Sequence, residues 1–396
     1  MNASPGGTPW VDWTARCISD PVLRLRFLKA AAPAWQAAPA KRHRWRWRGA
    51  GVALAALVFV LAAVRFLDVR KASASGTFET TLGAPPKISV PVSIPAGLSI
   101  PKDASPQEIW PVEQTAAYET YSNGLRIENK FSTGNHPRSY LAFAADQSNF
   151  ATERRTAPAG IVFHTTESLQ APFEPDQNGK LVKVGEALIE YVKRKKAYNF
   201  IIDRFGRVFR VVREADAAEH AGYSVWSDEK WLYVNLNESF LGVAVETRTQ
   251  PGQSDAAVTA AQIRAIAMLT EMLRQRYGIA AGNCVTHAQA SVSPTRMLAG
   301  YHMDWASSFP FEAVGLPDNY SRPLPSVAVF GFDCDASYSR TAGFRLSEGA
   351  RLGAQELARQ AAAAGTSVPA YRKAEQRRYR ERLAATRGAV ISHEGD

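Results

Sequence analysis

Short apolar runs bounded by polar or turn-forming residues recur along the second half of the chain. Residues 160–164 read as a short buried strand that ends on a histidine, and residues 237–247 hold a second run of this kind. Residues 198–203 and 208–212 are strand-like on either side of the turn at 204–207, which predicts a hairpin.

Two stretches repeat their apolar residues with a helical period. Residues 181–196 predict an amphipathic helix whose Lys and Arg residues gather at its end, where cations suit the helix dipole. Thr259 and Gln262 form a capping box before a second helix that ends at Gly278. Residues 345–390 are rich in Ala, Arg, Glu and Gln and predict one or two exposed helices, with contact to acidic lipid or an anionic wall as the alternative.

The N-terminal part carries an uncharged apolar run at residues 50–64, preceded by an Arg-rich cluster at 41–48. A span needs roughly 17 to 25 apolar residues, and interfacial side chains extend this one, so we expect a transmembrane signal anchor at 49–67 behind a cytoplasmic tail, 1–48. Ala72-Ser73-Ala74 leaves a cleavable signal peptide as the alternative, against which the long preceding segment argues.

Prolines interrupt residues 68–112, which predict an extended linker with an edge strand at 87–94. A catalytic domain is expected at 113–335, with its core at 158–315 and a charged helical tail at 336–396. Of 396 residues 46% are hydrophobic and 21% charged, as in ordinary globular proteins. The net charge of +10 sits mostly near the two ends, and the middle holds no nucleic-acid-binding motif, so no nucleic-acid partner is expected.

The expected membrane topology places the three cysteines in different compartments. Cys17 would lie in the reducing cytoplasm, whereas Cys284 and Cys334 would lie in an oxidising compartment. The latter two could form a disulfide or remain separate buried thiols, and their spacing resembles no metal-binding motif.

Candidate chemistry gathers at three places. His164 ends the first strand, His287 follows the second helix in Thr286-His287, and Asp304 closes the sequence Tyr301-His302-Met303-Asp304. Two imidazoles and one carboxylate are the ligand set of a catalytic zinc that leaves a position open for water.

Residues of about 158–315 resemble the type 2 N-acetylmuramoyl-L-alanine amidase and peptidoglycan-recognition family. The motifs that carry the resemblance occur in the family's order: the strand ending in His164, Tyr198-Asn199-Phe200 with Asp203 and Gly206, His220-Ala221-Gly222, Leu241-Gly242-Val243, Thr286-His287, and Asp304 before Phe309-Pro310. The resemblance implies an α/β fold with a mixed central sheet flanked by helices.

The resemblance also implies a site. Zinc would be held by His164, His287 and Asp304, with Tyr198 in the site and His302 stabilising the oxyanion. His220 and Asn199 would contact substrate or support its loop. His302 could instead replace Asp304 as the ligand, because only one of these two residues needs to reach the zinc.

The sequence departs from the family pattern at the general base. Many catalytic members carry a glutamate where this chain has Ala244, so Glu246 or Glu167 would have to take the proton. Trp305-Ala306 replaces the family's Pro-Gly after the last ligand.

The resulting hypothesis is a zinc-dependent amidase, anchored in the inner membrane and facing the periplasm, that cleaves peptidoglycan or muropeptides between N-acetylmuramic acid and L-alanine. The alternatives are a catalytically inactive peptidoglycan-binding sensor of the same fold, which Ala244 favours, and an amidase acting on another amide. Protein partners cannot be inferred.

Overall fold

The computed structural model describes residues 108–146, 152–168, 171–250, 257–334 and 341–391. Within these ranges no helix is both long enough and apolar enough to cross a membrane. The segment expected to do so, 49–67, lies outside the described residues, as do the expected edge strand at 87–94 and most of the linker.

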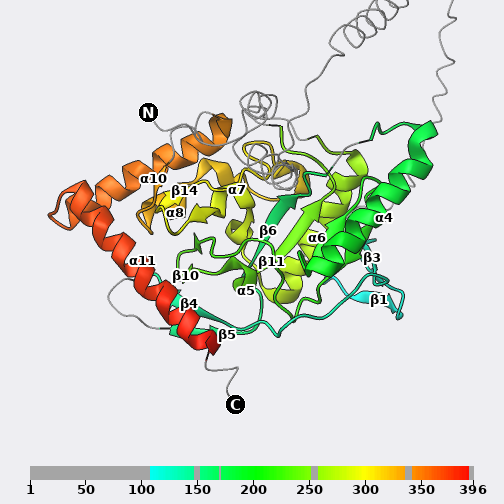
Figure 1. Cartoon of the computed structure of the whole chain (residues 1–396), viewed down its shortest axis with the longest axis horizontal. Coiled ribbons are helices and arrows are strands. Elements are labelled where there is room, and N and C mark those ends of the chain that lie inside the picture. The colour runs from blue at the N-terminus through cyan, green and yellow to red at the C-terminus, as the bar shows by residue number, and fades with distance from the viewer. Residues whose placement is uncertain (1–107, 147–151, 169–170, 251–256, 335–340, 392–396) are drawn as a thin grey trace, which may run out of the picture. The chain divides into compact units, whose positions relative to one another are not determined.

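A mixed eight-stranded sheet forms the centre of the fold (Figure 1). Its inner strands are parallel, and antiparallel strands extend one edge. In spatial order the strands are β1 (Pro111–Gln114), β2 (Tyr118–Tyr121), β3 (Arg126–Glu128), β8 (Val208–Arg210), β7 (Phe200–Ile202), β11 (Phe240–Val245), β6 (Gly160–Thr165) and β12 (Cys284–Thr286). The predicted hairpin is confirmed as β7 and β8.

Two helices cover opposite faces of this sheet. Helix α6 (Ala260–Tyr277) packs Ile266 and Leu269 in one core cluster with Val243 of β11, whereas α4 (Asn178–Lys195) packs Ile189 in a different cluster with Ala244. Neighbouring residues of a strand point to opposite faces, so the two helices sandwich the sheet. The predicted fold, a mixed sheet flanked by helices, is thereby confirmed, as is the capping box of α6.

Two smaller sheets and several short helices accompany the central sheet. A four-stranded sheet orders β5 (Thr152–Arg155), β4 (Tyr140–Ala144), β10 (Trp231–Tyr233) and β9 (Trp226–Ser227), and a three-stranded sheet orders β13 (Val292–Ser293), β14 (Leu298–Ala299) and β15 (Asp333–Cys334). The short α-helices are α5 (Leu236–Ser239), α7 (His287–Ala290) and α8 (Pro325–Ala328), and 3-10 turns lie at 175–177, 281–283, 312–314 and 319–321.

The strand predicted at 237–247 begins later than expected. Its first residues belong to α5, and the strand starts at Phe240. The cause is Asn237, whose side-chain oxygen accepts hydrogen bonds from the backbone N–H groups of His220, Ala221 and Gly222 at 2.7–2.8 Å. These contacts hold Asn237 against the 220–222 segment, before the strand begins.

The C-terminal helices are not the exposed tail that composition suggested. Helix α10 (Phe344–Ala363) buries Leu346 and Leu357, and α11 (Val368–Ile391) buries Tyr379, whose ring packs against Phe332 with centroids 4.8 Å apart. Figure 1 shows the two helices running along one side of the fold in orange and red. Their charged residues cover the outer face of helices that belong to the core.

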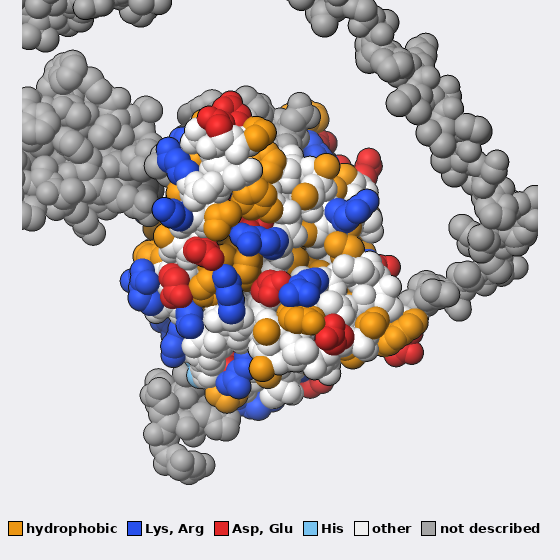
Figure 2. All heavy atoms as spheres, turned by 90° about the vertical axis from the view of Figure 1, so that its right-hand side faces the viewer, with side chains coloured by type: hydrophobic (Ala, Val, Ile, Leu, Met, Phe, Trp, Pro, Cys, Tyr) orange, Lys and Arg blue, Asp and Glu red, His pale blue; other side chains and the backbone are white. Residues whose placement is uncertain are grey.

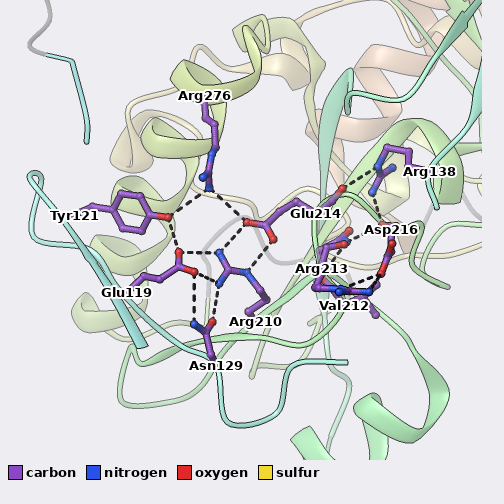
Figure 3. Close-up of polar contacts among 11 residues, drawn as sticks. Glu119, Tyr121, Asn129, Arg138, Arg210, Val212, Arg213, Glu214, Asp216 and Arg276 are labelled. Carbon is purple, nitrogen blue, oxygen red and sulfur yellow. Dashed lines mark hydrogen bonds and ion pairs between the residues drawn. The ribbon is translucent and has the colours of Figure 1, made fainter. Parts of the chain in front are cut away.

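A buried arginine ties the antiparallel edge to the central sheet (Figure 3). Arg210 of β8 bonds Glu119 at 2.7 Å, Asn129 at 2.6 Å and Glu214 at 2.8 Å. Burial opposes ionisation of Glu119, but hydrogen bonds from Arg210 and Tyr121 hold its pKa at about 2. The edge is thus joined by a fully paired polar network.

Figure 2 shows the side of the molecule toward which α4 lies in Figure 1, with Lys and Arg interspersed among acidic and apolar side chains. The cations at the end of α4 are Lys193, Arg194 and Lys195.

Cys284 and Cys334 form no disulfide with each other in the described structure, and burial raises the pKa of the Cys284 thiol to about 12.

Candidate metal centre

His164 occupies the carboxyl end of β6, between two parallel neighbours. In register it lies beside Ala244 of β11, and β12 pairs with the other edge of β6 up to Phe163. The side chain is fully buried. A histidine at this position is held rigidly, because both flanking strands restrain its backbone.

His287 and Asp304 reach the same point from later segments. His287 opens α7 directly after β12, where Thr286 and Gln289 form a capping box that sets the start of the turn. The backbone carbonyl of Asp304 accepts a hydrogen bond from Ala288 N at 3.3 Å. The segment around Asp304 is thereby fastened to the helix that carries His287.

The three side chains converge on one point. Asp304 Oδ2 lies 3.1 Å from His164 Nδ1 and 3.4 Å from His287 Nδ1, and one ligand atom from each residue lies within 4.8 Å of the other two. Burial lowers the pKa of His164 to about 4, and neighbouring His287 adds to this. Burial opposes ionisation of Asp304, but the two imidazoles hold its pKa far below the ordinary value.

The donor set fits a divalent cation. Two imidazole nitrogens and an ionised carboxylate oxygen face one another, and this combination is a zinc ligand set. His287 Nε2 is buried and has no hydrogen-bond partner among the described residues. This nitrogen is not the one that faces Asp304, which is Nδ1, so the fit of the cluster to an ion rests on the donor set itself.

Backbone strain gathers around this cluster. Glu167, Tyr198, Trp305 and Ala306 all have positive φ, at 48°, 58°, 69° and 42°. Non-glycine residues seldom adopt this conformation, and such residues concentrate at functional sites. Trp305 and Ala306 turn the chain directly after Asp304, where the sequence left the local turn open.

Tyr198 and His302 flank the ligands on different sides. The Tyr198 ring lies 4.9 Å from that of His164, and burial followed by the charges of Asp304 and Glu167 raises the pKa of its phenol well above the ordinary value. The His302 ring stacks on that of His287, with centroids 4.7 Å apart and planes at 20°. His302 therefore lies beside the cluster, while Asp304 supplies the oxygen within it.

His220 directly contacts His164, the first candidate ligand. Its Nδ1 lies 3.1 Å from His164 Nε2, and its Nε2 lies 3.2 Å from the carbonyl oxygen of Phe240. Burial, followed by the charges of His164 and Arg138, lowers the pKa of His220 well below the ordinary value, which keeps this imidazole neutral.

Asn199 is fully buried, contrary to a substrate-contacting role. Its amide nitrogen donates to the carbonyl groups of Val212, Arg213 and Asp216, and its oxygen accepts from Gly242 N at 3.0 Å. These bonds join β11 to the 212–216 loop and leave the side chain no surface for a substrate. The structure therefore gives Asn199 a supporting position.

The two candidate bases differ in their surroundings. Glu167 accepts from Thr165 Oγ1 at 2.6 Å and from Thr249 N at 2.7 Å, and its charge acts on the Tyr198 phenol. Glu246 instead accepts from Arg204 N at 3.1 Å, and burial raises its pKa to about 7. Ala244, in the position of the family's glutamate, is fully buried.

Sequence reasoning missed two supporting residues. Thr249 Oγ1 accepts from the backbone N–H of Trp305 at 3.0 Å and so anchors the turn after Asp304. Arg138 is buried and donates to the carbonyl of Phe240 at 3.0 Å, the same oxygen that His220 contacts. Neither residue belongs to a recognisable motif, because both act through backbone groups distant in sequence.

Residues 154–297 match the sequence model of the family Amidase_2, described as N-acetylmuramoyl-L-alanine amidase. The family resemblance expected from the sequence is confirmed for this segment. His164, His220 and His287 lie within it, whereas His302 and Asp304 follow its end and are brought to the site by the fold. A search of curated proteins finds no match.

Solved structures similar to this chain have low TM-scores. AmpDh3 from Pseudomonas aeruginosa, in complex with anhydromuramic pentapeptide, is 21% identical with a TM-score of 0.29, over 40% of this chain and 58% of that one. AmiD from E. coli, with a bound anhydro-muropeptide, is 22% identical with a TM-score of 0.29, over 40% and 56%. The amidase LysC from Clostridium intestinale is 17% identical with a TM-score of 0.25, over 48% and 93%. The chain thus spans little more than half of the first of these proteins, and the assignment rests on the family match.

Proposed function

We propose that this chain, whose residues 154–297 match the N-acetylmuramoyl-L-alanine amidase family, hydrolyses the amide between N-acetylmuramic acid and L-alanine of peptidoglycan or its fragments. The observation that carries the proposal is the convergence of His164, His287 and Asp304 at the ends of elements far apart in sequence. A binding protein without catalysis has no need of this buried ligand set.

His164, His287 and Asp304 would hold zinc, which when bound supplies a Lewis acid for the amide carbonyl and activates water. The remaining chemistry belongs to the side chains around the ligands. Tyr198 is protonated at neutral pH, as an ordinary tyrosine is, and its raised pKa favours the protonated form further, so its hydroxyl can donate a hydrogen bond to the oxygen that gains charge. His302, stacked on His287, is a second candidate donor.

Glu167 is the better of the two candidate bases. Its carboxylate lies near enough to Tyr198 for its charge to raise the pKa of the phenol, and Thr165 and Thr249 hold it in place. Glu246 is engaged by the backbone of the 203–207 turn. We propose that Glu167 accepts the proton of the attacking water and passes it to the leaving amine.

The experiment is to incubate the full-length chain with purified peptidoglycan and with muropeptides, and to measure released stem peptide with added zinc and with chelator. We expect zinc-dependent release that His164→Ala abolishes. His136→Ala is the matched control, since His136 pairs with Glu238 away from the ligand set. Binding without release in the wild type would support the sensor alternative, and release only from simple acyl amino acids would indicate a different amide.

We also propose that residues 49–67 anchor the protein in the inner membrane with the amidase segment in the periplasm. The proposal rests on the uncharged run at 50–64 and the preceding cationic cluster at 41–48. Carbonate extraction of membranes and reporter fusions after residue 75 test it. Release of the full-length chain by carbonate, or a cytoplasmic reporter signal, would contradict it.

A further inference from the structure

His220 lies between the first candidate ligand and strand β11. Its ring meets that of His164 edge-on, with centroids 5.2 Å apart and planes at 85°. Each of its nitrogens has one partner, His164 Nε2 on one side and the Phe240 carbonyl oxygen on the other. The contact is therefore polar and directional.

The partners determine which nitrogens carry hydrogen. A carbonyl oxygen can only accept, so His220 Nε2 must carry the hydrogen and donate it. In a neutral imidazole, Nδ1 then holds a lone pair and accepts from His164 Nε2–H. The remaining nitrogen of His164, Nδ1, then directs a lone pair at the cluster, 3.1 Å from Asp304 Oδ2, an arrangement of two acceptors that a cation between them would stabilise.

Arg138 opposes the alternative, a charged His220 that donates from both nitrogens. Its buried guanidinium donates to carbonyl groups of Glu214, Asp216, Glu238 and Phe240, two of which are drawn in Figure 3. A charged His220 would place a second buried positive charge on the same Phe240 oxygen. Burying charge in this way is costly, so the donor pattern of a neutral ring is preferred.

Gly242 makes room for the ring. A Cβ at this position would lie 2.7 Å from His220 Cγ and 2.9 Å from Cδ2, closer than real side chains approach. Gly242 is not among the glycines with positive φ, so the backbone does not demand glycine there. The missing side chain at Gly242 therefore leaves the space that the His220 ring occupies against β11.

We propose that His220 is a positioning residue that fixes His164 in the tautomer whose Nδ1 is presented to the metal ion. Phe240, Arg138 and Gly242 hold His220 in the required place. The inference rests on the proposed function, since it concerns the metal centre. Partners that orient a metal-binding histidine commonly change metal affinity by about 10- to 100-fold when removed.

The matched variants are His220→Asn and His220→Leu in the full-length protein. The two side chains have similar size, but only Asn retains an acceptor near the position of Nδ1. We expect His220→Leu to weaken zinc binding by about 10- to 100-fold in chelator competition, with His220→Asn within a few-fold of wild type. Gly242→Ala should weaken zinc binding too, although it removes no ligand or hydrogen-bonding atom.

A second measurement reads the tautomer directly. Nitrogen-15 NMR of zinc-loaded wild type, with histidines assigned by substitution, should show hydrogen on His164 Nε2 and none on His220 Nδ1, the nitrogen that accepts from it. Hydrogen on His220 Nδ1 in zinc-loaded wild type, or wild-type zinc affinity in a folded His220→Leu variant, would overturn the proposal. Absence of zinc binding by wild type would overturn the metal centre itself, whereas loss of activity with intact zinc binding in His220→Leu would contradict only the positioning role.

Discussion

Glu246 is a buried carboxylate that makes the stability of the folded chain depend on pH. It is 3% exposed, and its pKa of about 7 lies above the ordinary 4.5 mainly because burial disfavours the charge. A carboxylate of this kind binds its proton more tightly in the folded state. Stability from Glu246 is therefore fully present below pH 4.5 and is lost as the pH rises toward 7.

Glu246→Gln should thus be more stable than wild type above pH 7, by on the order of 1 to 2 kcal/mol, with the difference disappearing below pH 4.5. Chemical denaturation at several pH values measures this. Glu356→Gln is the control, since Arg359 lowers the pKa of Glu356 and the pH trend should reverse in sign. Parallel pH profiles for Glu246→Gln and wild type would contradict the assignment.

At the scale of elements, sequence patterns correctly predicted the strands and helices that depend on neighbouring residues. Strand β6, the hairpin of β7 and β8, and helix α6 with its capping box all follow from residues adjacent in sequence. Strands β1 and β5 escaped prediction because they are largely exposed and carry no apolar alternation. Arg210 holds the β1–β3 edge through residues about 90 positions away, a contact that no local pattern announces.

The candidate site also contains some residues that the sequence identified and others that only the tertiary structure places. His164 and His287 were identified from short motifs, and the fold unites them with Asp304. The burial of Asn199 and the place of His220 depend on the 212–216 loop, Gly242 and the Phe240 carbonyl, which only the tertiary structure brings together. Short motifs located the candidate ligands, whereas the residues that pack against them have weaker sequence signatures.

The residue that ends α4 allows the conformational cost of a left-handed helix cap to be tested. Lys196 caps the helix in the left-handed region at φ 51° and is exposed. Because glycine adopts this conformation without steric cost, Lys196→Gly should be about 1 kcal/mol more stable than Lys196→Ala. Comparing the two variants by denaturation removes the contribution of the lost lysine. Equal stability would mean that the cap is not strained.

At the scale of the whole molecule, the C-terminal helices should be required for folding. Leu357 of α10 is fully buried, so Leu357→Ala should cost about 2–4 kcal/mol in free energy of unfolding. Arg359→Ala, two residues on and exposed, should change little. Denaturant titration of both variants provides the measurement. A small effect of Leu357→Ala would mean that α10 is a detachable appendage.

The proposed ligands are widely separated along the chain, His164 and Asp304 being 140 positions apart. Three parallel strands must be aligned before these side chains can meet, so the site is a late product of folding. An ion bound there would stabilise the folded state without taking part in the earlier steps of folding. Zinc should accordingly slow unfolding while leaving the refolding rate unchanged, so that the ion prolongs the lifetime of the folded state.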